Sequence, residues 1–353
     1  MLGSNLPVSK SINPTPCALP IRYRWSCVTK NSNKVIPARP LSYIAYNQRK
    51  PSTKDSTMKI LITGASGFIG QQLVAHLANQ HELVLLTRHP GSSRQLLGPQ
   101  HQYLSTLDEI DDLNHIDAVI NLAGEPIVAK RWSAQQKQRI CDSRWNTTAR
   151  LSQLILHSCT PPKVMVSGSA IGFYGRQGAI PIDETAAPHP EFSHDICQEW
   201  ERLALQAATK TRVCILRTGI VLGHGGALAK MLPPFKLGLG GPIGHGCQGM
   251  SWIHIQDMVA LIDFLLNHDE CEGIFNATAP NPVSNAEFAT TLGRVLNRPT
   301  FITTPAAMLR LAMGEMAELL IEGQFVLPKH ALDAGFSFRF ELLEPALRDV
   351  LAS

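Results

Sequence analysis

The chain has 353 residues, of which 44% are hydrophobic, enough for one large α/β domain with an appendage or for two domains. No apolar run approaches the roughly 20 residues that a membrane-spanning helix needs, so we expect no membrane partner. The net charge of +4 is uneven: residues 1–57 carry nine Lys or Arg and one acid, and the remainder carries 23 Lys or Arg and 27 acids, a charge of −4. A mildly acidic body excludes an obvious nucleic-acid footprint.

The first 57 residues predict a disordered basic segment outside the fold. They are rich in Ser, Asn and Pro and lack hydrophobic periodicity. A basic, Ser-rich and acid-poor start resembles a transit peptide, which would direct the protein to a plastid or mitochondrion. The alternative is that the natural start is Met58, directly before the first strand, and that the protein is cytoplasmic.

The eight cysteines form no Cys-x-x-Cys pair and have no regular spacing. In the absence of a recognisable secretory signal, this favours reduced thiols in a reducing compartment. No cluster has the ligand spacing of a metal site, so no metal is expected.

The most informative stretch is residues 58–70, with the sequence MKILITGASGFIG. A short apolar run, typical of a buried strand, leads into Gly-x-x-Gly-x-x-Gly and then into a helical pattern. In such a motif Gly64 permits a tight turn, Gly67 lets a pyrophosphate approach the backbone, and Gly70 allows helix and strand to pack closely. The phosphates would lie at the helix N-terminus. The expected cofactor contacts here are Gly64, Ser66, Gly67, Phe68, Ile69 and Gly70.

Strand-like and helix-like segments alternate along the body, which predicts a doubly wound parallel sheet of Rossmann type. After about residue 217 the pattern changes to Gly- and Pro-rich loops and separate helices, which we interpret as a small α-rich C-terminal lobe. Strands are expected at 59–63, 83–87, 118–122, 163–167 and 213–216, and late helices at 255–267, 285–296, 308–322 and 342–351.

The end of the second expected strand favours NADP(H) over NAD. An acid at this position would bind the adenosine ribose hydroxyls and repel a 2′-phosphate. Here the strand ends in Thr87 and Arg88, and a guanidinium can pair with that phosphate through two donors. The alternative is that Arg88 is a solvated loop residue.

Four further motifs follow in chain order. They are Asn-Leu-Ala-Gly at 121–124, Ser-Gly-Ser-Ala-Ile-Gly-Phe-Tyr-Gly at 167–175, Leu-Arg-Thr-Gly-Ile-Val-Leu-Gly at 216–223 and Trp-Ile-His-Ile-Gln-Asp at 252–257. Together with the glycine motif, they resemble landmarks of the extended short-chain dehydrogenases/reductases, an epimerase-like superfamily. The resemblance implies a Rossmann-type fold and a bound dinucleotide.

A closer resemblance is to the atypical branch called epimerase family proteins, the 39U-like group. It rests on Arg131-Trp132, Asp142-Ser143-Arg144 and the segments 240–244 and 314–318. Residues 301–351 are similar to the small C-terminal domain of unassigned function in that branch. We therefore expect an NAD(P)-binding domain at 58–298 and a C-terminal domain at 299–351. The remaining expected cofactor contacts are Leu122, Ala123, Gly124, Glu125, Arg144 and Ile220.

The resemblance does not extend to the usual catalytic pair. The superfamily uses a Tyr and a Lys four residues later to move the proton, whereas Ser193 and Cys197 occupy these positions and Ser169 is the aligned residue that remains. Ser169 is thus the candidate for polarising a carbonyl. Tyr174 could donate the proton or line the pocket. Cys197 could act as nucleophile or acid, or be a packed residue.

For several other candidate site residues the sequence leaves two roles open. His194 and Asp195 could be acid/base groups or a local cap, and Glu125 could contact the nicotinamide ribose or act as a base. Arg144 replaces the superfamily's helix asparagine and could contact the cofactor or form an ion pair. Arg131 and Trp132 could shape the site or cap the following helix. The apolar stripe of the helix expected at 308–322 should lie in the core. Segments 223–226 and 238–244 could form a lid over the substrate cleft or be ordinary connections. His254 and Asp257 are expected to order the second lobe.

The sequence therefore predicts an NADP(H)-dependent oxidoreductase or epimerase-like enzyme that acts on an unidentified small molecule. The alternative is a non-catalytic NADP(H)-binding regulator with a protein partner, for which the family resemblance implies a link to cell or plastid division. A homodimer is a further open alternative.

Overall fold

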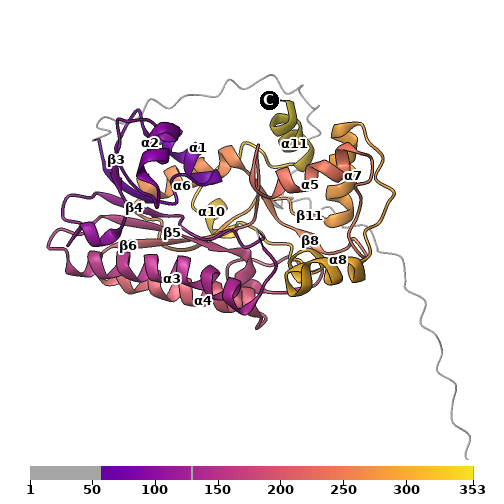
Figure 1. Cartoon of the computed structure of the whole chain (residues 1–353), viewed down its shortest axis with the longest axis horizontal. Helices are drawn as coiled ribbons and strands as arrows, with labels where there is room; N and C mark the ends of the chain where they lie inside the picture. Colours follow the sequence, from indigo (N-terminus) through magenta and orange to yellow (C-terminus); the bar gives the residue numbers. More distant parts are fainter. Residues whose placement is uncertain (1–56, 129, 353) are drawn as a thin grey trace, which may run out of the picture. The chain divides into compact units, whose positions relative to one another are not determined.

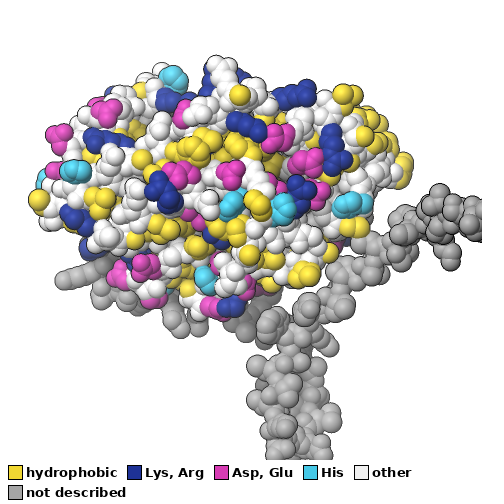
Figure 2. All heavy atoms as spheres, turned by 90° about the horizontal axis from the view of Figure 1, so that it is seen from below, with side chains coloured by type: hydrophobic (Ala, Val, Ile, Leu, Met, Phe, Trp, Pro, Cys, Tyr) yellow, Lys and Arg dark blue, Asp and Glu magenta, His cyan; other side chains and the backbone are white. Residues whose placement is uncertain are grey.

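The computed structural model describes residues 57–128 and 130–352, which form one compact unit. The predictions about the basic N-terminal segment concern residues that lie almost entirely outside this range, so they stay predictions. No helix in the described part is long and apolar enough to cross a membrane. On the face shown in Figure 2, basic and acidic side chains are interspersed and do not gather by sign.

The centre of the fold is a seven-stranded parallel sheet with the order β10-β6-β5-β4-β1-β2-β3 (Figure 1). This confirms the predicted Rossmann-type architecture. The five expected strands are present within a few residues of their predicted ends, and β3 and β10, which the sequence pattern did not reveal, form the two edges. The strands are β1 (Lys59–Thr63), β2 (Glu82–Leu86), β3 (Gln102–Leu104), β4 (Ala118–Asn121), β5 (Val164–Ala170), β6 (Arg212–Thr218) and β10 (Gly273–Ala277).

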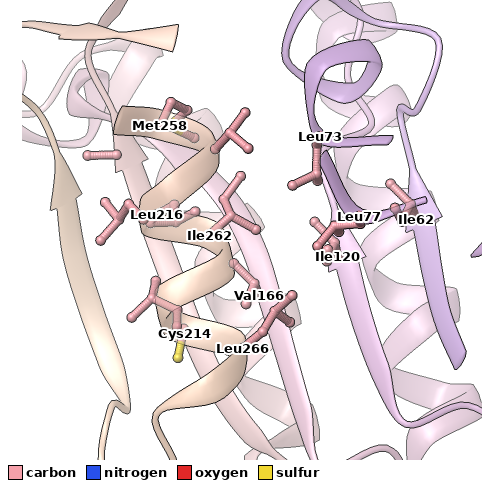
Figure 3. Close-up of a cluster of buried hydrophobic side chains, with 14 of the residues drawn as sticks. Ile62, Leu73, Leu77, Ile120, Val166, Cys214, Leu216, Met258, Ile262 and Leu266 are labelled. Carbon is pink, nitrogen blue, oxygen red and sulfur yellow. The ribbon is translucent and has the colours of Figure 1, made fainter. Parts of the chain in front are cut away.

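Helices cover both faces of this sheet because its strands are apolar on both sides. Alternate residues of β1 divide between the two cores: Ile60 and Ile62 face α1 and α6, and Leu61 faces α3 and α4. Figure 3 shows the first of these cores, where Leu73 and Leu77 approach Ile62 and Ile120. The covering helices are α1 (Phe68–Leu77), α2 (Pro90–Leu97) and α6 (Ile255–Asn267) on one face, and α3 (Ala134–His157) and α4 (Phe192–Leu205) on the other.

A second core is formed by residues that follow β6 in the chain, and it is built around Trp252 and Phe288. The C-terminal helix α11 packs there through Leu343 and Leu347, so the last residues of the chain share one core with residues 220–296. The elements of this region are β7 (Ile220–Leu222), α5 (Gly226–Lys236), β8 (Gly249–Met250), β9 (Trp252–His254), β11 (Val283–Ser284), α7 (Asn285–Leu296) and α11 (Leu343–Ala352).

His254 and Asp257 hold the C-terminal segment onto this region, as expected. His254 Nδ1 caps α6 by accepting the N–H of Gln256 at 3.2 Å, and the His254 ring packs against that of Phe340, with 3.9 Å between the ring centroids. The Asp257 carboxylate accepts the backbone N–H groups of Arg339 and Phe340 at 2.8 and 2.9 Å. These contacts are structural, and they fix the segment that precedes α11.

The expected single helix at 308–322 with a buried stripe is wrong. The segment breaks at Gly314, whose φ of +63° cannot continue an α-helix. Of the predicted stripe Met316 is buried and Ala312 is exposed, and the other members are half-buried: Leu309, Met313, Leu319 and Leu320. Helical spacing of apolar residues therefore did not predict burial here. The segment contains α8 (Ala306–Met313), the 3-10 helix η4 (Gly314–Ala317) and α9 (Glu318–Ile321), and α10 (Lys329–Asp333) follows it.

Candidate functional site

The glycine turn after β1 is shaped as the motif predicts. Gly64 has φ +72°, and a Cβ on it would lie 2.6 Å from the carbonyl oxygen of Leu122. A Cβ on Gly70 would collide with the backbone of Gly64 and Ala65. The N-cap of α1 is Gly67, and no side chain caps this helix end. The first N–H groups of α1 therefore remain available to an anion, which suits a pyrophosphate.

Phe68, the first residue of α1, fixes the glycine-rich segment that precedes α5. Cβ atoms on Gly223, Gly225 and Gly226 would each lie within 3.0 Å of the Phe68 ring. The three glycines thus let the backbone wrap around this ring, next to the glycine turn of β1. Because residues 223–226 are packed at the cofactor edge, the structure favours the alternative that they are an ordinary connection over the alternative that they form a lid.

The end of β2 provides a basic group at the same edge of the sheet. The Thr87 hydroxyl lies 2.7 Å from that of Ser93 in α2, which ties the strand end to the helix. Arg88 is exposed and has no ion pair with any other residue that the structure describes. The position and freedom of its guanidinium fit a ligand phosphate near the start of α2.

A buried network that the sequence reasoning missed holds the turn after β4. Thr63 donates its hydroxyl proton to Asn121 Oδ1 at 2.8 Å, and Asn121 Nδ2 donates to Thr148 and Ser167 at 2.8 and 3.2 Å. The N–H of Ala123 donates to Thr63 Oγ1 at 3.1 Å. The sequence signal that could have indicated this network is the polar residue at the end of each central strand. The network positions the turn formed by Leu122, Ala123, Gly124 and Glu125.

Arg144 lies beneath this turn. Its Nη1 donates to the carbonyl oxygens of Glu125 at 3.0 Å and Ile140 at 3.1 Å, and its guanidinium lies over the Trp200 ring at 5.1 Å. A Cβ on Gly124 would be 2.9 Å from the guanidinium carbon. Arg144 forms no ion pair within the described residues, which disfavours the ion-pair alternative and leaves cofactor contact as the remaining prediction.

Ser169 faces the interior of the β5–α4 interface. Its hydroxyl donates to Glu201 Oε1 at 2.6 Å. Glu201 in turn forms a bidentate pair with Arg217, at 2.9 and 2.8 Å, and all three side chains are buried. Burial alone would lower the pKa of Arg217, but the hydrogen bonds and charge of Glu201 outweigh it and raise that pKa. The two parallel hydrogen bonds from Arg217 are those of an arginine–carboxylate ion pair, and the single proton of the Ser169 hydroxyl is directed to the same carboxyl group.

Tyr174 is fully buried, which argues against the expected pocket-lining position. Its hydroxyl donates to Asn276 Oδ1 at 2.8 Å, and its ring lies beside the Arg217 guanidinium. Burial raises the pKa of this phenol. The side chain links β10 to the 3-10 helix η2 (Ile171–Tyr174), a packing role for which the short motif gave no signal.

Cys197 is buried on the face of α4 that meets β5. Burial, reinforced by the charge of Glu201, raises the pKa of its thiol to about 11. A thiol with such a pKa is almost entirely protonated at neutral pH, which disfavours a nucleophile. This geometry supports the interpretation of Cys197 as a packed residue.

The other candidates near α4 make structural contacts. The His194 ring nitrogen Nδ1 lies 2.7 Å from the carbonyl oxygen of Phe173, and Ser193 donates to Glu191 at 2.7 Å. The cap of α3 is Ser133, so the alternative that Arg131 or Trp132 caps it is wrong. Instead the Trp132 indole donates to the Ile127 carbonyl oxygen at 3.0 Å.

The cofactor candidates lie in turns at the carboxyl edge of the sheet, whereas the catalytic candidates Ser169 and Cys197 are buried between β5 and α4. The glycine turn, Arg88 and the turn at 122–125 meet at one edge, since the carboxyl ends of parallel strands lie together. Ile220 lies beyond them, in β7, where its N–H donates to Ser251. Within the described residues, no cluster of His, Cys, Asp or Glu has the arrangement of a metal site. The fold, together with the glycine turn and the basic group at the carboxyl edge of the sheet, defines a dinucleotide-binding α/β protein of Rossmann type.

Comparison with known proteins places this chain within that class. Residues 60–278 match the model of the NAD dependent epimerase/dehydratase family, and residues 304–350 match a domain of unknown function, DUF1731. The chain belongs to the NAD dependent epimerase/dehydratase family, with the C-terminal domain that the sequence resemblance implied.

Relatives cover most of the chain. The chain is 40% identical to the Arabidopsis thaliana epimerase family protein SDR39U1 homolog, named chloroplastic, over 85% of this chain and 88% of that protein. It is 37% identical to Bacillus subtilis epimerase family protein YfhF, over 84% and 98%. The crystal structure of human epimerase family protein SDR39U1 with NADPH has 36% identity and a TM-score of 0.77, covering 84% of this chain and all of that one.

Proposed function

We propose that this chain is an NADP(H)-dependent oxidoreductase or epimerase-like enzyme that acts on a small molecule of unidentified structure. The observation that carries the proposal is the glycine turn with the uncapped N-terminus of α1, next to the exposed Arg88 at the end of β2. The NADPH in the crystal structure of the human relative supports the same cofactor. When bound, this cofactor supplies or accepts a hydride.

The chain's own residues have separate tasks in this proposal. The first N–H groups of α1 hold the pyrophosphate, and Arg88 pairs with the 2′-phosphate through charge-assisted hydrogen bonds. The turn at 122–125, held by Asn121 and Thr63, borders the nicotinamide half. Ser169 would polarise a substrate carbonyl only after its hydroxyl rotates away from Glu201.

A second candidate is a non-catalytic NADP(H)-binding regulator that acts through a protein partner. The observation that favours it is the use of the Ser169 and Tyr174 hydroxyl protons inside the protein, by Glu201 and Asn276. In this case cofactor occupancy, and not turnover, would be the output. The link to cell or plastid division belongs to this alternative. A plastid location depends instead on residues 1–57 being a transit peptide, and the relative named chloroplastic supports it.

Titration of the purified chain with NADPH and NADH tests the shared part of both candidates. We expect NADPH to bind at least tenfold more tightly, because a charge-assisted pair contributes about 1.5–3 kcal/mol. The Arg88→Ala variant should lose most of this preference, with little change in NADH affinity. Arg94→Ala, one turn into α2, is the control and should keep the preference. Equal affinity of the natural chain for NADPH and NADH would contradict the proposal.

Turnover separates the two candidates. Offered a library of small carbonyl compounds, an enzyme should oxidise NADPH with at least one of them, as followed at 340 nm. Ser169→Ala should then abolish turnover and leave NADPH affinity unchanged. If no compound is reduced and a partner protein binds differently with and without NADPH, the regulatory function is the correct one.

A further inference from the structure

The turn after β4 has a positive charge directly beneath it. Arg144 reaches this position from the third turn of α3, and the absence of a side chain on Gly124 leaves room for its guanidinium. Carbonyl oxygens of Glu125 and Ile140 accept hydrogen bonds from Nη1 and fix the group in place. The charge is therefore built into the site and is not a mobile surface group.

This charge is not neutralised by an ion pair. Among the residues that the structure describes, no carboxylate lies within 4 Å of the Arg144 guanidinium. The nearby Glu125 carboxylate attracts it from a greater distance. Burial lowers the pKa of Arg144, but a guanidinium keeps its proton in proteins. Its neutral contacts, the two carbonyls and the Trp200 ring, leave one net positive charge beneath the turn.

The strand order shows which half of a dinucleotide meets this charge. The order β3-β2-β1-β4-β5 reverses direction between β1 and β4, and a dinucleotide lies across the crevice at such a point in this type of fold. Arg88 follows β2 and marks the adenosine side. The turn with Gly124 and Glu125 follows β4, on the opposite side of the glycine turn. Arg144 therefore lies beneath the nicotinamide half.

We propose that Arg144 makes this site selective for the reduced cofactor, so that NADPH binds more tightly than NADP⁺. The two forms share the same phosphates, and thus the same contacts with Arg88 and α1. They differ in the nicotinamide ring, which is neutral when reduced and carries one positive charge when oxidised. A fixed cation in a partly buried site disfavours the charged ring. The inference rests on the proposed binding of NADP(H).

Selectivity of this kind has a consequence for the bound couple. A tenfold preference for NADPH raises the midpoint potential of the bound couple by about 30 mV relative to free cofactor. The protein would then hold NADPH as its resting occupant even where both forms are present. Such occupancy suits a reductase waiting for its substrate, and it equally suits a protein that reports the supply of NADPH.

The test compares two dissociation constants in the full-length protein, without any turnover. NADPH binding is followed by its fluorescence and NADP⁺ binding by calorimetry, in the same buffer. We expect the ratio of the NADP⁺ constant to the NADPH constant to be about ten or more. Arg144→Gln should bring it close to one, whereas Arg144→Lys should retain most of it. Glu125→Gln removes the opposing charge and should increase the ratio.

The matched control is Arg150→Gln, which removes a partly buried arginine from the same helix. Arg150 lies near Asp108, at 3.7 Å, away from the turn. This variant should leave the ratio unchanged. Because only a ratio is read, a general loss of affinity through disturbed packing does not imitate the expected result.

Three results would overturn the inference. They are a natural chain that binds both forms equally, an Arg144→Gln variant that keeps the preference, and a Glu125→Gln variant with an unchanged or smaller ratio. If Arg144→Gln does not fold, the ratios of the natural chain and of Glu125→Gln still test the inference. A natural chain that binds neither form would instead refute the proposed function.

Discussion

The cofactor edge and the β5–α4 interface both contain polar groups but use them in opposite ways. At the edge, the first N–H groups of α1 and the guanidinium of Arg88 have no partner among the described residues that competes with a ligand. In the interface, the Ser169 hydroxyl, the Glu201 carboxylate and Arg217 bind one another. The polar groups at the cofactor edge are therefore available to a ligand, whereas those of the β5–α4 interface are already hydrogen-bonded to one another in a closed network.

The closed network is first tested by removing one partner of its ion pair. Arg217→Met should destabilise the fold by about 3–5 kcal/mol, since it leaves Glu201 charged and buried without a counter-ion. Urea denaturation measures this change. The double variant Arg217→Met, Glu201→Gln is the control and should recover much of the loss. A single variant as stable as the natural chain would show that Glu201 already reaches water, and the contrast with the cofactor edge would then fail.

The open edge is tested by filling the space at Gly64. Gly64→Ala places a Cβ at φ +72° and 2.6 Å from the Leu122 carbonyl oxygen. The φ alone costs about 1–2 kcal/mol, and relief of the contact must displace the turn. We expect weaker NADPH binding by calorimetry and a lower melting temperature.

Gly335→Ala is a matched control for that variant. Gly335 has φ +86°, but a Cβ there meets no atom within 4 Å among the described residues other than its chain neighbours. This change should lower stability by a similar φ penalty and leave NADPH affinity intact. Should both variants bind NADPH normally, the glycine turn would not be the phosphate site.

The smallest effect concerns the chemistry of two thiols. With a pKa of about 11, Cys197 is about 0.1% thiolate at pH 8 and is also buried. Iodoacetamide should therefore label the exposed Cys159 in the folded protein and leave Cys197 unlabelled, as read by peptide mass spectrometry. In urea both should react. Rapid labelling of Cys197 in the native protein would contradict this expectation and restore Cys197 as a candidate nucleophile.

Local patterns in the sequence determined the parts of this protein that depend on neighbouring residues. The glycine motif required a strand before it and a helix after it, and β1 and α1 are both present. Apolar runs located the central strands, and Arg88 at the end of β2 followed from position alone. Helices α6 and α7 were predicted with the bounds that the structure has, because their amphipathic patterns end at clear helix boundaries.

Tertiary structure alone decided which side chains face a ligand and which face one another. Ser169 aligned with a catalytic position, yet its direction depends on Glu201, 32 residues away, and on Arg217 beyond it. Tyr174 finds its partner Asn276 after 102 residues. The stripe at 308–322 had helical spacing, but most of it is only half-buried, and its helix breaks at Gly314. Periodicity records which faces of an element are apolar; burial and hydrogen bonding depend on what the rest of the chain brings to those faces.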